Sequence, residues 1–396
     1  MIIKNKSELE WPPWPSYPDK QVNAAKNVLA SGQVNYWTGT EGRKFEQEFA
    51  AYIGTEHAIA VSNGSVALGA SLRALNLPSG AEVIVTPRTF VATVSEIILA
   101  GLRPVFADVD ADSQNLTAET IAAVVTERTA AILVVHLAGW PCDMPDICAL
   151  AREHGFVVIE DCAQAHGAEI NDRKVGAWGD IAAFSFCQDK VMTTGGEGGM
   201  IVTSNEDLFQ YCWSFKDHGK KHSMLTSSAS GTAFRWVHES VGTNLRLTEL
   251  QSAIGRIQLA GLDDSVVQRN RNAADLFARL EGIKGLRVPR PSKDYLHAFY
   301  KCYVFINPED ISSGWSRDRV LSELIEFGIP NGSGICPEVY LEHAFTDLDI
   351  LPNDPLPVAR HLGQTSLMFR VDPALTSQHM HLIADTLISI MKRACR

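Results

Sequence analysis

Short runs of β-branched residues alternate with helical stretches between residues 58 and 203, and this alternation leaves few folds open. The runs predict strands at Ala58–Val61, Glu82–Thr86, Arg103–Asp108, Ala131–His136, Val157–Asp161, Ile181–Ser185 and Gly199–Thr203. Helical spacing occurs between most of these runs, near Ser65–Ala74, Thr89–Ala100, Ala118–Val125 and Met144–His154. Strands that alternate with helices are typical of βα units, whose strands are parallel and buried. The sequence therefore predicts an α/β fold with a mainly parallel central sheet flanked by helices.

The part of the chain after residue 249 shows a different pattern of predicted helices and strands. A long helical stretch runs from Leu250 to Glu281, and the remainder is typical of a small α+β unit. Its expected elements are strands at Tyr300–Ile306 and Ser366–Phe369 and helices at Arg317–Phe327 and Gln378–Lys392. Because 396 residues are more than a domain with one hydrophobic core usually contains, we expect two domains. We expect a large domain with an N-terminal arm at residues 1–262 and a small C-terminal domain at residues 263–396.

Charge and composition exclude several classes of protein. The chain has 35 basic and 46 acidic residues, a net charge of -11, which argues against a nucleic-acid surface. We find neither an apolar run of the roughly 18–20 residues that spans a membrane nor a signal peptide. The eight cysteines form no CxxC pair, and the cysteines and histidines lack metal-ligand spacing. These features predict a reduced cytoplasmic protein with no metal site.

Polar residues follow the predicted strands at their carboxyl ends, where ligands bind in sheets of this kind. Asp161 ends an apolar strand, and a buried carboxylate is costly without a partner. A protonated pyridine nitrogen would be such a partner, although local N–H groups could also satisfy the acid. Gln164 is placed to bond a phenolic oxygen of the same ring. His166 could pack over the site or be a core histidine.

Lys190 lies between a strand with aromatic residues and a turn with four glycines. Its neighbours are mostly apolar or neutral, and a desolvated lysine has a lowered pKa and attacks carbonyl groups. The alternative for this segment alone is a surface lysine before a hairpin.

The turn at Gly64 and Ser65 lies between a strand and a helix, where free backbone N–H groups can bind phosphate. Many βα turns share this pattern, so the turn is a weak signal alone. Phe90, at the end of the next strand, could stack on a flat cofactor or pack in the core.

Taken together, these segments resemble the DegT/StrS-type sugar aminotransferases, which are fold-type I enzymes that use pyridoxal 5′-phosphate (PLP). The resemblance covers nearly the whole chain, and the ordered combination is far more specific than any one piece. It is carried by Gly39 with Phe45-Glu46, Ser62–Ser65, Thr89-Phe90, Gly101–Asp108, His136–Gly139, Glu160-Asp161 to His166-Gly167, the Lys190 segment, Asp217–Gly219, Gly242–Arg246 and Gly255–Leu259.

The resemblance implies a role for each matching residue. Lys190 would form the Schiff base with PLP and shuttle protons, Asp161 would bind the pyridine nitrogen, and Gln164 the phenolic oxygen. The remaining cofactor-binding positions are Phe90 for stacking, Gly64, Ser65 and Ser185 for phosphate, and Asn244, which would bind the phosphate of the neighbouring subunit. The family pattern thus implies a homodimer with shared active sites. We expect His166, His218 and Arg246 to contact the substrate.

The implied reaction moves an amino group from an amino acid, L-glutamate, to a nucleotide-linked keto-sugar in amino-sugar and surface polysaccharide biosynthesis. By family frequency the acceptor is a 4-keto-6-deoxyhexose on dTDP, UDP or GDP. The alternatives are a PLP-dependent sugar dehydratase, whose relatives carry histidine at the lysine position, another fold-type I enzyme acting on amino acids, and a non-catalytic sensor or scaffold. Cys187-Gln188-Asp189 and Gly195-Gly196 depart from the common family pattern, and His297–Lys301 and Gly332–Cys336 lie in a divergent C-terminal region. That region and the 219–238 loop should shape the sugar and nucleotide pockets, so the acceptor stays open.

Overall fold

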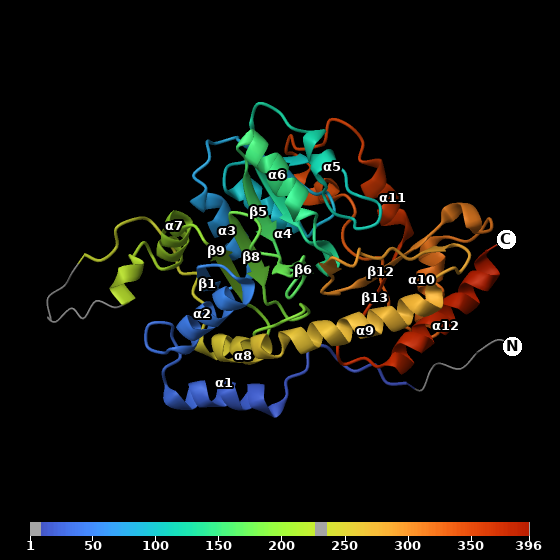
Figure 1. The fold of residues 1–396 in the computed structure, drawn as a ribbon, viewed down its shortest axis with the longest axis horizontal. Helices are drawn as coiled ribbons and strands as arrows, with labels where there is room; N and C mark the ends of the chain where they lie inside the picture. The colour runs from blue at the N-terminus through green and yellow to red at the C-terminus, as the bar shows by residue number, and fades with distance from the viewer. Residues whose placement is uncertain (1–8, 226–235, 396) are drawn as a thin grey trace.

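The computed structural model describes residues 9–225 and 236–395. Its centre is a seven-stranded sheet in the order β1-β9-β8-β5-β4-β2-β3 (Figure 1). Along the chain the strands are β1 (His57–Val61), β2 (Glu82–Val85), β3 (Arg103–Phe106), β4 (Thr129–Val135), β5 (Val157–Asp161), β8 (Ile181–Ser185) and β9 (Gly199–Thr203). Within this sheet β9 pairs antiparallel with both β1 and β8, and the other pairs are parallel. The predicted mainly parallel sheet is therefore confirmed.

Helices cover both faces of the sheet because alternate strand residues point to opposite sides. On one face, Ile59 and Leu133 pack with Leu68 of α3 (Gly64–Ala74), and α4 (Val91–Leu99) and α7 (Glu206–Lys216) extend this cluster. On the other face, Phe184 packs with Phe49 of α2 (Glu41–Ile53), and α6 (Met144–His154) covers β4 and β5. The carboxyl ends of the parallel strands lie between these layers and are left open for a site.

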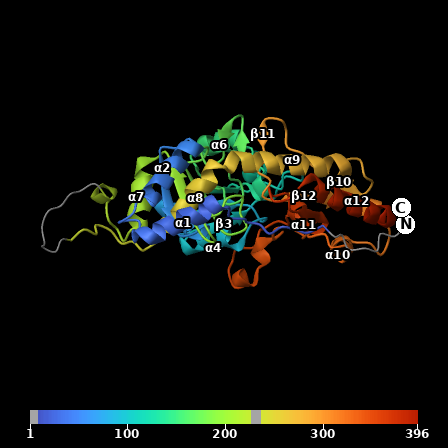
Figure 2. The same ribbon diagram turned by 90° about the horizontal axis from the view of Figure 1, so that it is seen from below.

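The predicted helical stretch from Leu250 to Glu281 is two helices, α8 (Glu249–Ala260) and α9 (Leu262–Leu280). The break is at Gly261, and glycine has a weak helix propensity. Early in α9, Val266 packs with the large sheet's cluster, whereas Leu276 packs in a second apolar cluster further along the helix. Figures 1 and 2 show α9 as a long rod running from α8 to the α12 region. The domain division after residue 262 stays a prediction.

The second cluster contains a three-stranded sheet, β10 (Leu286–Arg287), β12 (Cys302–Ile306) and β13 (Ser366–Phe369), packed against α9 and α12 (Ser377–Ala394). Another small sheet joins β11 (Tyr295–Leu296), β6 (Glu169–Ile170) and β7 (Arg173–Lys174). The remaining helices are α1 (Asp19–Ser31), α5 (Ala118–Ala122), α10 (Arg317–Glu326) and α11 (Pro357–Thr365), with 3-10 turns at Leu137–Gly139, His222–Leu225, Pro308–Asp310, Val339–Leu341 and His343–Phe345. Among the described residues, none of the helices has the length and apolar character to cross a membrane.

Candidate active site

A cavity of about 650 Å³ lies at the carboxyl ends of the parallel strands. It is bordered by loops that follow β1, β2, β5 and β8, as expected for a ligand site in such a sheet. Most of the residues predicted to bind the cofactor line it together, namely Gly64, Ser65, Phe90, Asp161, Gln164, Ser185 and Lys190.

Lys190 lies in the loop after β8, and its backbone is held at both polar groups. Its N–H donates to the carbonyl of Cys187 at 3.1 Å, and its carbonyl accepts from the indole Nε1 of Trp14 at 3.0 Å. The Lys190 Nζ lies 4.8 Å from the centroid of the Tyr300 ring. The backbone is thereby fixed while the amino group faces the cavity wall formed in part by Tyr300.

Trp14 belongs to an N-terminal arm that is tied to the far end of the chain. Arg370 donates to the carbonyl of Pro12 at 2.9 Å, and the Nε2 of His379 lies 3.0 Å from the carbonyl oxygen of Glu10. The arm therefore connects the lysine loop to residues near the C-terminus.

Asp161 ends β5 and is only 5% exposed. One carboxylate oxygen accepts from the N–H of Ala163 at 3.1 Å, and the other accepts from the hydroxyl of Thr93 at 3.0 Å. Burial raises the pKa of Asp161, although these two hydrogen bonds and the charge of Lys190 act in the opposite direction. Asp161 makes no ion pair within residues 9–225 and 236–395, so a bound cation would stabilise its charged form.

The first turn of α3 contributes an anion-binding surface to the cavity. Asn63 caps the helix by accepting from the N–H of Val66 at 3.0 Å, so the N–H groups of Gly64 and Ser65 are left without helical acceptors. A Cβ at Gly64 would come within 2.6 Å of the Cβ of Ser185, so only glycine allows this close approach. Backbone donors and the Ser185 hydroxyl thus converge on one corner of the cavity.

Two other wall residues present groups suited to a flat ring. The Oε1 of Gln164 accepts from the N–H of Ala138 at 2.9 Å, which leaves its NH₂ group as a donor toward the cavity. Phe90 is the N-terminal cap residue of α4 and is 61% exposed, which is unusual for a phenylalanine. An exposed aromatic ring on a cavity wall can stack on a planar ligand.

His166 is buried and does not line the cavity in the described part of the chain. Its ring packs near Phe184 and Phe186, with ring centroids 5.4 Å and 5.7 Å away. Burial, together with the charge of Lys190, lowers the pKa of His166 to about 3, so the ring is neutral. Its role as a substrate contact stays a prediction.

His218, Asn244 and Arg246 lie outside the lining of this cavity. All three lie next to Asp217 in the sequence or contact it. Its carboxylate accepts from Arg246 Nη1 at 2.9 Å and from the indole of Trp37, and its backbone forms a β-bridge with Asn244. Asn244 and His218 are exposed. His218 and Asn244 thus face outward, whereas Arg246 is turned toward the buried Asp217 and is bridged to Val61 at the end of β1.

Thr93, Asp189 and Tyr300 are cavity residues that sequence reasoning missed. Thr93 could have been found, because it lies four residues after Thr89 in the helix predicted near Thr89–Ala100, which begins at a strand end. In the structure the two hydroxyls lie 2.8 Å apart. Tyr300 and Asp189 left no such local signal, since 111 residues separate them.

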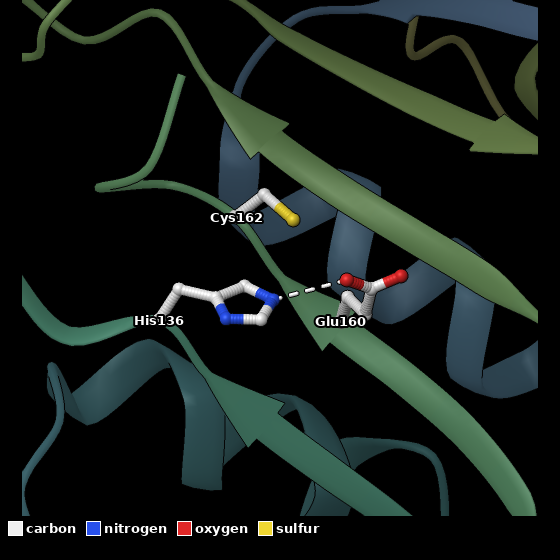
Figure 3. A group of neighbouring side chains, drawn as sticks. All are labelled: His136, Glu160 and Cys162. Carbon is white, nitrogen blue, oxygen red and sulfur yellow. Dashed lines mark hydrogen bonds and ion pairs between the residues drawn. The ribbon is translucent and has the colours of Figure 1, made fainter. Parts of the chain in front are cut away.

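Behind Asp161, a buried group of His136, Glu160 and Cys162 has the residue types of a metal site (Figure 3). The Nε2 of His136 lies 3.0 Å from Glu160 Oε2, and its Nδ1 accepts from the N–H of Cys142 at 3.0 Å. Glu160 also accepts from the N–H groups of Gly176, Trp178 and Gly179. These contacts already engage both ring nitrogens and both carboxylate oxygens, so we interpret the group as a hydrogen-bonded brace under β5.

The residues of the cavity fit PLP. The buried Asp161 needs a cation and would receive one from a protonated pyridine nitrogen, while Lys190 provides an amine in the same cavity. The donors at Gly64, Ser65 and Ser185 suit a phosphate group, and Phe90 suits the face of the ring.

Comparison with known proteins gives the same assignment. The DegT/DnrJ/EryC1/StrS aminotransferase family matches residues 16–388. The chain is 35% identical to a UDP-N-acetyl-3-dehydro-alpha-D-glucosamine 3-aminotransferase of Acidithiobacillus ferrooxidans over 354 residues, which are 89% of each chain. It is 33% identical to the GDP-perosamine synthase of Escherichia coli O157:H7, covering 94% of this chain and 97% of that protein.

A solved structure shares the fold throughout. The aminotransferase from Psychrobacter cryohalolentis superposes with a TM-score of 0.94 and 47% identity, covering 97% of this chain and all (100%) of the other. These findings confirm the resemblance seen in the sequence and the expected cofactor. The chain belongs to the DegT/DnrJ/EryC1/StrS aminotransferase family and is a PLP-dependent enzyme.

Proposed function

We propose that this enzyme transfers the amino group of L-glutamate to a keto-sugar carried on a nucleotide, in the biosynthesis of an amino-sugar for surface polysaccharide. One observation carries the proposal: Lys190, Asp161 and the first turn of α3 border a single cavity. The names of the two relatives support the substrate class, since one is a 3-aminotransferase of a UDP-linked sugar and the other a GDP-perosamine synthase.

Each site residue has a distinct part in this proposal. Bound PLP supplies a sink for the electron pair left when a proton is removed from the donor's α-carbon. Lys190 takes that proton and returns one, acting as base and then as acid. Asp161 binds the ring nitrogen, and Gly64, Ser65 and Ser185 bind the phosphate. A lysine at position 190 also favours amino transfer over the dehydratase alternative, whose members carry histidine there.

The experiment loads the purified enzyme with L-glutamate, removes free amino acid, and adds candidate acceptors singly while the cofactor absorbance is followed. The acceptors are keto-sugars on dTDP, UDP and GDP, with the keto group at carbon 4 or carbon 3. Return of the starting spectrum with one of these supports the proposal. 2-Oxo acids are added as a comparison. If they restore the starting spectrum and none of the keto-sugars does, the protein is an amino-acid transaminase.

We also infer a homodimer in which Asn244 of one subunit completes the site of the other. The exposure of Asn244, and its absence from the lining of its own cavity, support this inference. The eight cysteines are all free, which fits a cytoplasmic enzyme in a reducing compartment.

A further inference from the structure

Two segments that are far apart in the sequence meet beside Lys190. Asp189 directly precedes the lysine, and Tyr300 and Lys301 lie more than 100 residues later, before β12. The Tyr300 hydroxyl donates a hydrogen bond to the Asp189 carboxylate, and the Lys301 Nζ lies 3.7 Å from the same carboxylate oxygen. Asp189 and Tyr300 both line the cavity, so this contact is part of the active-site wall.

The ring of Tyr300 faces positively charged groups. The Nζ atoms of Lys190 and Lys301 lie 4.8 Å and 4.6 Å from its centroid, within the range of cation–π attraction. The hydroxyl end of the ring is anchored on Asp189, next to Lys190 in the chain. Burial alone would raise the pKa of Asp189, but the Tyr300 hydrogen bond and the charges of Lys190 and Lys301 hold it lower, so the anchor is ionised. Tyr300 therefore touches the lysine loop at two points.

The backbone before Tyr300 is strained. Phe299 has a φ of +45°, in the left-handed region that bulky residues avoid. It is held there by three contacts: its N–H donates to His297 Nδ1 at 2.7 Å, its carbonyl accepts from Arg269 at 3.1 Å, and its ring stacks on His297 with centroids 3.8 Å apart. Strain of this kind persists where surrounding structure imposes it, and it concentrates at functional sites.

The same Arg269 supports the other side of the lysine. Its guanidinium carbon lies 4.9 Å from the Trp14 ring, and Trp14 donates to the carbonyl of Lys190. Arg269 is 1% exposed, so this buried cation joins the arm that holds the lysine backbone to the turn that presents Tyr300. Both supports of Lys190 thus share one buried residue.

We propose that Tyr300, anchored on Asp189, is a positioning residue that holds the amino group of Lys190 in the orientation needed for proton transfer. The inference rests on the proposed function, because it takes Lys190 as the group that moves protons. Tyr300 then controls the rate of the step at the donor's α-carbon and leaves the binding of the donor nearly unchanged.

The test compares Tyr300→Phe, Asp189→Asn and the double variant in single turnovers with L-glutamate. Tyr300→Phe keeps the ring and loses the anchor, and Asp189→Asn weakens the anchor from the other side. We expect each single variant to slow the half-reaction about tenfold, the loss that one side-chain hydrogen bond commonly carries. The glutamate concentration for half-maximal rate should stay within about twofold. The double variant should be no slower than the slower single variant, because both remove one contact.

Tyr52→Phe is a matched control elsewhere in the chain. The Tyr52 hydroxyl donates to Asp263 at 2.6 Å, the Lys174 Nζ lies 4.3 Å from the ring centroid, and that Nζ is 3.6 Å from Asp263. The control therefore removes the same type of hydrogen bond from the same tyrosine, aspartate and lysine grouping. It should react with glutamate at the wild-type rate.

Several results would overturn the inference. These are a wild-type half-reaction rate in Tyr300→Phe, a loss confined to the half-saturating glutamate concentration, or a double variant as slow as the product of the single losses. If Tyr300→Phe does not fold, as judged by its melting temperature, a wild-type rate in Asp189→Asn decides against the inference. Borohydride reduction separates the two proposals: a label on Lys190 with no rate change rejects only the positioning role, and a label elsewhere rejects the assignment of Lys190.

Discussion

The hydroxyl of Thr93 donates a hydrogen bond to the buried carboxylate of Asp161, at 3.0 Å. Thr93 thereby stabilises the charged form of the acid, against the effect of burial on its pKa. We expect Thr93→Val, which has the same shape, to lower turnover about 10-fold to 100-fold, as for hydrogen bonds to charged groups. Steady-state kinetics would measure the loss. Thr365→Val is the control, because Thr365 is also buried and, among the described residues, its hydroxyl donates only to the carbonyl of His361 in α11. Equal losses in the two variants would contradict the role of Thr93.

Lys190 should be the residue that is covalently linked to PLP. Borohydride reduction followed by peptide mass mapping should place the label there, and Lys190→Ala should bind PLP without a covalent bond and lose transamination. Lys301 is the most informative competitor, because it is near Lys190 and burial lowers its pKa. A label on Lys301, Lys174, Lys216 or Lys220 would refute the assignment.

Asp161→Asn should fold but lose most of its rate. A neutral amide does not keep the pyridine nitrogen protonated, so the electron sink weakens. We expect turnover to fall at least about a hundredfold, with circular dichroism unchanged. Near wild-type turnover would mean that Asp161 is a structural acid and that the nitrogen binds elsewhere.

Asn244 should serve the site of the other subunit. If Lys190→Ala and Asn244→Ala are each nearly inactive, refolding them together at equal amounts makes half the dimers mixed. Each mixed dimer then has one site with both lesions and one intact site, so about a quarter of wild-type activity per site returns. Activity at the level of the parents, with mixed dimers verified by mass, would place Asn244 in its own subunit's site.

The Glu160 brace should make stability depend on pH. Burial alone would raise the pKa of Glu160, but the hydrogen bonds from His136 and the Gly176 and Gly179 N–H groups hold it below its ordinary 4.5. Because the folded pKa is the lower one, this stabilisation is present above about pH 4.5 and is lost as the pH falls through the folded value. Glu160→Gln should lower the free energy of unfolding in urea by roughly 3–5 kcal/mol at pH 7. The difference between wild type and variant should become smaller below pH 4.5. A difference in unfolding free energy that does not change with pH would contradict this account.

Patterns within single segments made much of the fold predictable. The seven strands of the large sheet follow from short β-branched runs and the helices between them from helical spacing, and the observed ends differ by a few residues at most. The two-residue strands β6, β7, β10 and β11 were not predicted, because two residues carry no periodicity. The break at Gly261 was also missed, since one glycine within a helical pattern often continues the helix.

The site residues likewise divide into those that a local sequence pattern predicts and those that it does not. Asp161, Lys190 and the Gly64 turn stand at strand ends, where the chain order alone brings ligand-binding groups together. Tyr300 meets Asp189 across 111 residues of sequence, directly after a strained turn at Phe299. Contacts between distant segments depend on tertiary packing, which spacing along the chain does not encode.

The arm that ends at Trp14 has a consequence for how the enzyme is made. Its anchors are Arg370 and His379, which a ribosome synthesises more than 350 residues after Pro12 and Glu10. The sheet and the Lys190 loop can fold while the chain is still growing, but the arm cannot make its contacts with Arg370 and His379 until the final helix has emerged. A nascent chain therefore has fewer contacts to hold the arm that supports Lys190, and a product truncated before this helix would keep a less firmly anchored lysine loop.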